Sequence, residues 1–281
     1  MPLPLLSSIA SNIELAPDGI WASPFISAVS YPGEDNDACF AVEANSFWFT
    51  HRNECILDVV RTFPPLEAFF DIGGGNGFVA KMLQDNGIDV VLVEPGLDGV
   101  RNALRRGISN VVRSTLRDAG FLPSVLPAVG LFDVVEHIQD DHAFMSDIFR
   151  HLIPGGRVYL TVPAFQWLWS HEDVQAGHWR RYTLNNICAL LDNSGFQVEF
   201  ATYFFAFLIL PIFFSRVLPF RFYLARKTDI HQTLHHDHQI VNPIANRLIS
   251  WFRNRELARI AVGRPLKLGG SCLVVARKPG P

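Results

Sequence analysis

The chain has 281 residues and a mass of 31.5 kDa, with 49% hydrophobic and 18% charged residues. This length permits one large domain, or one domain that carries an insertion, and the composition excludes a disordered or collagen-like chain. Residues 1–215 hold 12 basic and 24 acidic side chains, whereas residues 216–281 hold 12 and 3, so the net charge of −3 combines −12 with +9. A basic segment of this size attracts anionic surfaces such as phospholipid head groups or nucleic acid.

The N-terminal sequence and the cysteines indicate the compartment. Residues 1–6 lack the basic region and the long apolar stretch of a secretion signal. The four cysteines are widely spaced without a CxxC pair, which argues against a zinc site and a disulfide framework. We therefore expect reduced thiols and a cytoplasmic location, with peripheral attachment to the inner membrane face if the basic segment binds lipid.

From about residue 68 to residue 200, strand patterns alternate with helical patterns, which is typical of βαβ units. The predicted strands are Leu66–Ile72, Ile88–Val93, Asn110–Arg113, Ala128–Phe132, Arg157–Val162, Phe196–Tyr203 and Ser271–Arg277. The predicted helices of this region are Gly77–Asn86, Leu97–Arg106, Asp141–Leu152 and one that Thr183 caps and Gly195 ends. Pro154 to Gly156 is expected to form the turn before the fifth strand.

More than sixty residues separate the sixth strand from the last one. This segment begins with an uncharged run, Phe200–Ser215, which is broken by Pro211 and is shorter than the ~20 residues of a membrane-spanning helix. We therefore predict no transmembrane helix here.

A second helix is predicted in this segment over Ile244–Val262, between the cap Asn242 and the terminator Gly263. Its apolar residues share one face, and they are Ile244, Leu248, Trp251 and Phe252. Its four arginines are Arg247, Arg253, Arg255 and Arg259. A basic amphipathic helix of this kind can lie in a membrane interface. The alternative is that it packs on the domain and that its arginines are only solvated.

The strongest chemical signal is Phe70-Asp71-Ile72-Gly73-Gly74-Gly75-Asn76-Gly77, between the first strand and its helix. Its glycines let the backbone approach a ligand closely, and the helix N-terminus offers unpaired N–H groups. Glu94 ends the second strand, where it can accept hydrogen bonds from both ribose hydroxyls of a nucleoside. A dinucleotide-binding fingerprint would need a third glycine at the position of Phe78.

These residues resemble the nucleotide-binding motif of the class I S-adenosylmethionine-dependent methyltransferases, and in particular a bacterial small-molecule subgroup similar to types 11 and 23. The resemblance covers residues 45–205 and the last strand, and it includes Phe132–Ile138 and Leu152–Gly156. It implies an α/β fold, Rossmann-like and doubly wound, with a seven-stranded, mostly parallel sheet. The last strand would be antiparallel, and a helical insertion would precede it.

The resemblance implies S-adenosylmethionine as the cofactor. Asp71 would lie near the methionine amino group, Gly73 and Gly75 would pass under it, and Glu94 would hold the ribose. Ser46–Asn53 is similar to a helix before the first strand, in which Arg52 meets the cofactor carboxylate or, alternatively, pairs with Glu54 or Asp58 at the surface. The implied cofactor contacts are Arg52, Asp71, Gly73, Gly74, Gly75, Gly77, Glu94, Pro95, Ser114, Thr115 and Asp133.

A histidine-rich cluster follows the fifth strand, at the sheet edge where doubly wound folds bind ligands. His178 is the candidate general base, because a neutral imidazole can take a proton from a hydroxyl or an amine. Asp173 would orient it, and Tyr182 completes the predicted catalytic group. The alternative is a structural histidine, since methyl transfer can proceed by proximity and alignment without a base.

Two groups of residues raise the question of a metal ion. Asp133, Glu136 and His137 resemble the acid-acid-His metal site of quinone-pathway O-methyltransferases, but we favour the interpretation that the two acids begin a helix. The histidines at positions 231, 235, 236 and 238 are interpreted as part of a solvated loop. The sequence therefore predicts no metal site.

The sequence as a whole predicts a methyltransferase that acts on an oxygen or nitrogen nucleophile of a small or lipid-linked acceptor. Residues 1–45 would form an N-terminal extension or lid, 46–205 the cofactor-binding core, 206–268 the apolar and basic insertion, and 269–281 the last strand and tail. The insertion would be a lid or a platform on an anionic membrane, through residues 200–265.

Two alternatives come from other classes of protein. An RNA methyltransferase would use the basic segment as its binding surface, but no Asn-Pro-Pro-Tyr sequence follows the fourth strand, which disfavours a nucleic-acid partner. The other alternative is a module that binds the cofactor without turnover.

Overall fold

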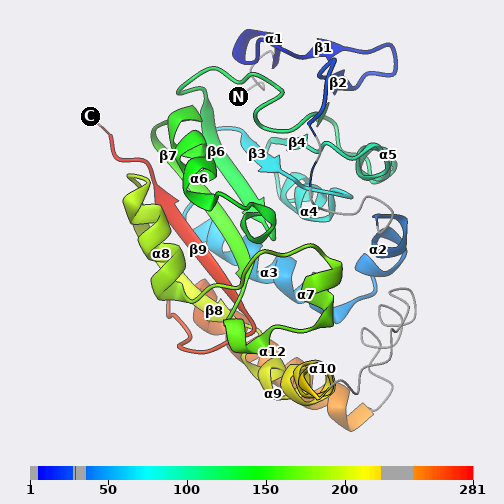
Figure 1. Cartoon of the computed structure of the whole chain (residues 1–281), viewed down its shortest axis with the longest axis vertical. Coiled ribbons are helices and arrows are strands. Elements are labelled where there is room, and N and C mark those ends of the chain that lie inside the picture. Colours follow the sequence, from blue (N-terminus) through cyan, green and yellow to red (C-terminus); the bar gives the residue numbers. More distant parts are fainter. Residues whose placement is uncertain (1–5, 28, 30–35, 223–242, 281) are drawn as a thin grey trace.

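The computed structural model of the chain describes residues 6–27, 29, 36–222 and 243–280. Its centre is one nine-stranded sheet with the order β1-β2-β5-β4-β3-β6-β7-β9-β8, covered by helices (Figure 1). The strands are β1 Glu14–Leu15, β2 Trp21–Ala22, β3 Phe69–Ile72, β4 Val90–Val93, β5 Val111–Arg113, β6 Leu126–Phe132, β7 Leu152–Pro163, β8 Gln197–Phe204 and β9 Ser271–Arg277.

The α-helices surround this sheet in the order of the chain. They are α1 Leu6–Ile9, α2 Asn36–Glu43, α3 Phe47–Thr62, α4 Phe78–Asp85, α5 Leu97–Arg105, α6 Asp141–His151, α7 His171–Gln175, α8 Leu184–Asn193, α9 Ile209–Ile212, α10 Leu218–Arg221 and α12 Pro243–Ala261. Short 3₁₀ turns cover η2 Val135–His137, η3 Gln166–Leu168 and η4 Ala206–Leu208, and η5 Phe213–Val217 is a π-helical turn.

The strand pairing confirms the predicted fold class. Strands β3 to β7 pair in parallel, whereas β9 runs antiparallel between β7 and β8. All seven expected strands are present, and β3 and β4 are buried along their whole length. Parallel strands in such a sheet lie between two layers of helices, which is why their sequences are almost continuously apolar.

The N-terminal region differs from the prediction, because its two short strands extend the sheet that the sequence assigned to residues 46–205. Trp21 of β2 pairs in parallel with Val112 of β5, and the Ser23 N–H donates to the Arg113 carbonyl. The predicted boundary at residue 45 therefore does not coincide with the edge of the sheet. Strands of two residues are too short to show a period in the sequence.

The turn expected at Pro154–Gly156 lies inside the bounds of β7. Gly155 adopts a positive φ of 82°, and its N–H donates to the Lys278 carbonyl rather than to β6. The register between β6 and β7 shifts between Leu126 and Ala128, and regular pairing starts at Arg157, as predicted.

The sheet separates two hydrophobic cores, and neighbouring residues of one strand face opposite cores. Phe70 packs in the core that holds Met145 of α6 and Ile187 of α8. Phe69 packs on the other face, with Ile56 of α3 and Leu83 of α4. This alternation is the consequence of the two-residue period of a strand.

The uncharged run Phe200–Ser215 divides into two structures, because its first residues complete β8 and the rest are helical. Its helical part is joined to the core through Phe205, Leu208 and Ile212, which are buried with the residues of α3 and α4. Among the described residues, no helix combines the length and the apolar character needed to cross a bilayer.

Helix α12 confirms the predicted basic helix and packs along α3. The Glu256 carboxylate lies 2.7 Å from Nε2 of His51 in α3 and also accepts hydrogen bonds from the backbone N–H groups of Phe205 and Ala206. Arg253 pairs with Glu54 at 3.0 Å. These contacts attach the insertion to the core at the end of β8.

Candidate active site

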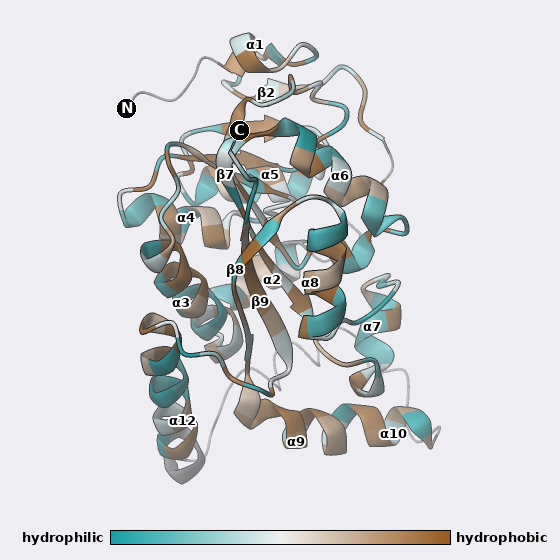
Figure 2. Cartoon of the chain, turned by 90° about the vertical axis from the view of Figure 1, so that its left-hand side faces the viewer, coloured by the Kyte–Doolittle hydropathy of each residue, from teal (hydrophilic) through white to brown (hydrophobic). Residues whose placement is uncertain are grey.

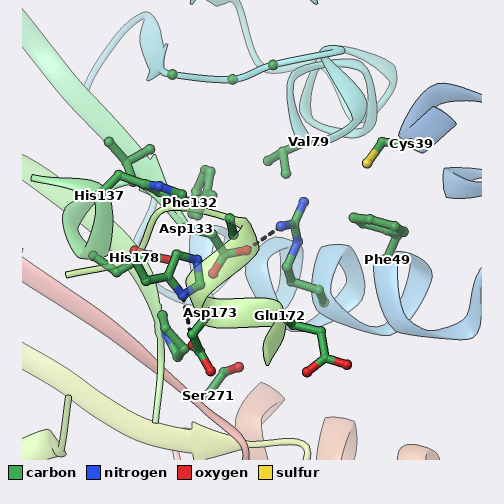
Figure 3. A pocket seen from close by; sticks show the side chains of 18 of the residues that line it. Cys39, Phe49, Val79, Phe132, Asp133, His137, Glu172, Asp173, His178 and Ser271 are labelled. Carbon is green, nitrogen blue, oxygen red and sulfur yellow. Dashed lines mark hydrogen bonds and ion pairs between the residues drawn. The ribbon is translucent and has the colours of Figure 1, made fainter. Parts of the chain in front are cut away.

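A cavity of about 920 Å³ opens at the carboxyl ends of β3, β4, β6 and β7. Its volume is at the upper end of the 300–1,000 Å³ range of ligand sites, so it has room for a nucleoside cofactor and part of a second molecule. The glycine loop after β3, helix α3, the segment after β6, helix α7 and the insertion all contribute to its wall. Figure 3 shows His137 and His178 on one side of this cavity and Phe49 and Cys39 on the other.

The glycine loop and Glu94 form one connected unit. Gly75 has a φ of +53°, which favours glycine, and a Cβ built on it would meet no atom within 4 Å, so this side of the loop is open. The Glu94 carboxylate accepts hydrogen bonds from the N–H groups of Gly75 at 2.9 Å and Gly96 at 2.7 Å. Burial raises the pKa of Glu94, although these two donors oppose the effect.

Asp71 lies beneath the glycine loop, and only 1% of its surface is exposed. Neither carboxylate oxygen has a hydrogen-bond partner among the described residues. Burial raises the pKa of Asp71 to about 7, and Glu94 adds to this shift, whereas Arg52 and the nearby backbone N–H of Ala80 act against it. A buried carboxylate that lines a cavity without a partner is complementary to a ligand that brings a cationic donor.

At Gly74 the loop has no room for a side chain. A Cβ built on Gly74 would lie 2.3 Å from the Leu92 side chain and 2.6 Å from an Asp71 carboxylate oxygen. The loop therefore lies directly against Asp71. Together with Glu94, these residues fit the cofactor that the sequence implies.

Arg52 of α3 lines the cavity and pairs with the Asp133 carboxylate, not with Glu54 or Asp58 as one interpretation of the sequence expected. Asp133 follows β6 with a positive φ of 58°, and its other oxygen accepts a hydrogen bond from the Thr161 hydroxyl at 2.9 Å. In Figure 3, Asp133 lies near the centre of the view, between His178 and Phe49. Arg52 is thus held in the cavity, where it can also meet an anionic group of a ligand.

His178 and Asp173 form the hydrogen-bonded pair that the sequence predicted. Nδ1 of His178 lies 2.9 Å from Oδ1 of Asp173, which is fully buried. Asp173 also accepts hydrogen bonds from Arg181 Nε and the Ser170 N–H, both at 2.8 Å. Burial would raise the pKa of Asp173, but the hydrogen bonds from His178 and Arg181 hold it below its ordinary value.

Glu136 and His137 lie beside His178, which the sequence did not predict. The rings of His137 and His178 are 4.7 Å apart, and one ligand atom each from Glu136, His137 and His178 lies within 4.8 Å of the others. Among the described residues, this is one of two groups whose ligand atoms lie close enough to hold a metal ion, and the other is His51, Cys55 and Glu256. Asp133, which belongs to the series considered in the sequence, is in neither group. Burial raises the pKa of Glu136 well above its usual range, and burial together with His178 lowers that of His137 to about 4.

Four of the predicted site residues lie outside the cavity wall. Gly77 caps α4, with a φ of +73°. The Ser114 hydroxyl is buried 2.6 Å from that of Ser23, and Thr115 donates to Asp118. Tyr182 is buried in the core, where its hydroxyl donates to Asp141 at 2.8 Å, and burial followed by this bond raises its pKa. Tyr182 therefore bonds to Asp141 in the core and does not reach the cavity that His178 lines.

The cavity wall also includes residues that the sequence did not single out. Glu43 of α2 is buried there and pairs with Arg106, which follows α5. Ile212 and Arg216, from the insertion, line the same cavity. They are four positions apart and so share one face of the helical segment. The histidines predicted to lie in a loop at positions 231, 235, 236 and 238 fall outside the described residues.

A sequence profile described as a methyltransferase domain matches residues 49–200, more than half of the chain. A curated protein of Mycolicibacterium smegmatis, described as a probable S-adenosylmethionine-dependent methyltransferase, is 26% identical over 180 residues. That match covers 62% of this chain and 67% of the relative.

The fold is similar to several solved structures. Phosphoethanolamine N-methyltransferase 2 of Haemonchus contortus, solved with S-adenosylmethionine, is 21% identical with a TM-score of 0.53, and the match covers 89% of this chain and 58% of that protein. The chain therefore spans little more than half of that enzyme. A Haloferax volcanii protein, solved as a putative methyltransferase with its Trm112 activator, gives a TM-score of 0.56 at 15% identity, covering 88% and 97%. A [4+2]-cyclase gives 0.52 at 16% identity, covering 92% and 100%, so the fold alone does not specify methyl transfer.

Proposed function

The chain belongs to the methyltransferase-domain family, and from this premise we propose that it transfers the methyl group of S-adenosylmethionine to an oxygen or nitrogen nucleophile of a small or lipid-linked acceptor. One observation carries the proposal. A single cavity contains both the unpaired carboxylate of Asp71 beside the glycine loop and the imidazole of His178 held by Asp173.

On the cofactor side, each polar group has a distinct role. Asp71 offers its carboxylate to the methionine amino group, and Arg52 offers its guanidinium to the methionine carboxylate. Glu94, which already accepts hydrogen bonds from Gly75 and Gly96, lies where the ribose hydroxyls would meet it. When bound, S-adenosylmethionine supplies an electrophilic methyl group.

On the acceptor side, His178 is the group that accepts the proton of the nucleophile. The Asp173 carboxylate accepts a hydrogen bond from Nδ1 of His178, and in the neutral imidazole this arrangement leaves the lone pair on Nε2. Nε2 can therefore take a proton from an attacking hydroxyl or amine, and Asp173 stabilises the resulting imidazolium. Glu136, His137 and Trp179 line the cavity around this group.

The apolar part of the acceptor is expected to lie against the insertion. Ile212 is 8% exposed and lines the cavity, and Arg216 of the next turn lies 3.5 Å from Glu172 of α7. An acceptor with a polar nucleophile and an apolar chain would place the first at His178 and the second along Ile212. This arrangement supports a lipid-linked acceptor over a wholly polar one.

Two measurements test the proposed function. Isothermal titration calorimetry should give micromolar binding of S-adenosylmethionine and of S-adenosylhomocysteine to the full chain. The protein is then incubated with methyl-tritiated S-adenosylmethionine and a cell extract, and the tritium is counted in lipid, aqueous and nucleic-acid fractions. Label in the lipid fraction supports a lipid-linked acceptor, and label in the aqueous fraction supports a small one.

The other outcomes each overturn part of the proposal. Absence of cofactor binding would contradict the whole proposal. Cofactor binding without label in any fraction would favour a binding module without turnover, and label confined to RNA would replace the acceptor by a nucleic acid.

A further inference from the structure

The insertion exposes large apolar side chains at the end of the molecule formed by α9, α10 and α12. We call this the apolar–basic surface. Its apolar members are Leu210, Phe214, Phe222, Leu248, Trp251 and Phe252, and its basic members are Arg221, Arg247, Arg255 and Arg259. Figure 2 shows α9, α10 and α12 together at one end of the chain, with apolar colouring along α9. Exposed apolar side chains gathered in this way mark an interaction site.

The helical segment that starts at α9 has apolar residues on two faces, one toward the cavity and one exposed. Ile212 is buried in the cavity wall, and Arg216 lies on the same face. Leu210 and Phe214 are also four positions apart, but they are 67% and 62% exposed. Among the described residues, packing on the protein covers Ile212 and leaves Leu210 and Phe214 exposed.

Helix α12 also has one face packed on the protein and exposed apolar residues on the other face. Its buried residues, Glu256 at 3% exposure and Ile260 at 1%, face α3 and the end of β8. Leu248, Trp251 and Phe252 are 56%, 53% and 46% exposed. The helix therefore buries Glu256 and Ile260 against the protein, and it exposes a tryptophan on its outer face.

The two helical regions are joined by a ring contact. Phe252 of α12 stacks with Phe207, which precedes α9, with ring centroids 6.3 Å apart. Arg255 lies over the Trp251 ring at 5.4 Å, so a cation accompanies the exposed tryptophan. Both Figure 1 and Figure 2 place these helices at the same end of the molecule.

The positive charge of the insertion indicates which kind of partner the apolar–basic surface can bind. In the described residues 205–222 and 243–268 there are eight basic side chains and one acidic side chain, Glu256, which is buried and paired. Two copies of this surface would bring like charges together, which disfavours a second copy of the chain. An RNA would neutralise the arginines but would leave Leu210 and Leu248 without a role.

We propose that the apolar–basic surface docks on an anionic phospholipid membrane. The apolar side chains enter the boundary between head groups and acyl chains, and the arginines contact the phosphates. The inference deepens the proposed function and rests on it in one respect: the residues that line the cavity, Ile212 and Arg216, lie on the same segment, so docking brings the cavity to the bilayer that holds a lipid-linked acceptor.

The test is flotation of the full chain with large vesicles of phosphatidylcholine alone, or with a third of phosphatidylglycerol, at low and high salt. Two double variants, Leu210→Ser with Phe214→Ser and Leu248→Ser with Trp251→Ser, remove apolar members from each helix. We expect the wild type to float with anionic vesicles, less so in high salt, and each double variant to lose about tenfold or more in partitioning.

A matched control removes exposed apolar side chains elsewhere. Leu15 and Leu122 are 57% and 43% exposed and lie far from the insertion in sequence, and their replacement by serine should leave flotation unchanged. Calorimetry with S-adenosylhomocysteine is run on every variant. Retained cofactor binding shows that the variant is folded, and it separates a failure of docking from a failure of the proposed function.

Three results would overturn the inference. The first is a wild-type protein that stays in the bottom fraction of the gradient with every kind of vesicle. The second is flotation that neither double variant reduces. The third is self-association or RNA binding that the double variants abolish while vesicles capture nothing, which would assign the surface to a second copy or to nucleic acid.

Discussion

The two sides of the cavity each contain a buried aspartate, and the two carboxylates are in opposite states. Asp71, beside the glycine loop, has no hydrogen-bond partner among the described residues, and burial raises its pKa to about 7. Asp173, beside α7, accepts hydrogen bonds from His178, Arg181 and the Ser170 N–H, and its pKa is lowered. Burial penalises both charges, so the partners decide the outcome. The first carboxylate is prepared to bind a ligand, and the second positions a residue of the protein.

The largest expected effect tests the acceptor side. His178→Ala should reduce methyl transfer by about 100- to 1,000-fold, because it removes the base, while cofactor affinity changes by less than about twofold. Turnover is measured by tritium transfer and affinity by calorimetry. His142→Ala, which removes an exposed histidine from α6, is the matched control. Unchanged turnover in His178→Ala would assign the histidine a structural role.

The attachment of the insertion gives the next largest effect. Glu256→Ala should lower the free energy of unfolding by about 3 kcal/mol, since it leaves His51 and the N–H groups of Phe205 and Ala206 buried without their acceptor. Thermal unfolding should then occur about 5–10 °C lower. Glu67→Ala removes an exposed glutamate and should have no such effect. A loss below about 1 kcal/mol would show that the insertion is held by apolar packing alone.

The cofactor side is tested by Asp71→Asn. The variant should bind S-adenosylhomocysteine about 10- to 100-fold more weakly, because it loses a charge-assisted hydrogen bond to the amino group. The unliganded variant should also unfold at a higher temperature than the wild type, since it no longer buries an unpaired acid. Asp98→Asn, which removes an exposed carboxylate of α5, is the control. Unchanged affinity would place the ligand elsewhere in the cavity.

The pH dependence of cofactor affinity and of stability tests the unusual state of Asp71 directly. Because the pKa of Asp71 is raised to about 7, its carboxylate gains protons between pH 8 and pH 6, and cofactor affinity should fall about tenfold over this range. The folded state then binds more protons than the unfolded state between pH 4 and 7, so this group makes the unliganded protein more stable as the pH falls from 7. Calorimetry and thermal unfolding at pH 6, 7 and 8 check both signs, and Asp71→Asn should remove both dependences.

The smallest expected effect is that of metal removal. The proposed proton transfer uses His178 as the base and needs no metal ion. We therefore expect turnover to change by less than about twofold after treatment with EDTA. A loss that added Mg²⁺, Mn²⁺ or Zn²⁺ restores would instead show that Glu136, His137 and His178 hold a catalytic ion.

The difference between the two sides also explains what the sequence could predict. Asp71, the glycines and Glu94 belong to consecutive strand–loop–helix units, so their order in the chain nearly determines their positions. The Arg52–Asp133 pair spans 81 positions and the His51–Glu256 pair 205. Such contacts depend on which helix packs where, and a local period carries no information about that.

The errors have the same origin. Tyr182 follows His178 by four positions, but it forms a bridge with Ala164, and its hydroxyl bonds to Asp141 in the core. The position of Ser114 and Thr115 after β5 predicts that they line the cavity. In the structure β2 pairs with the edge of β5, and the Ser114 hydroxyl is hydrogen-bonded to that of Ser23. The sequence places Leu248, Trp251 and Phe252 on one face of α12, and only the contact of α12 with α3 shows that these residues are exposed.

The order of β7, β9 and β8 in the sheet has a consequence for biosynthesis. β9 lies between β7 and β8, although the whole insertion is synthesised after β8 and before β9. Until residues 271–277 leave the ribosome, β7 and β8 have no strand between them and each keeps an open edge, which is a risk for aggregation in a nascent chain. The insertion is available during this interval. A nascent chain that reached a membrane through it would complete its sheet at the place where the enzyme is proposed to work.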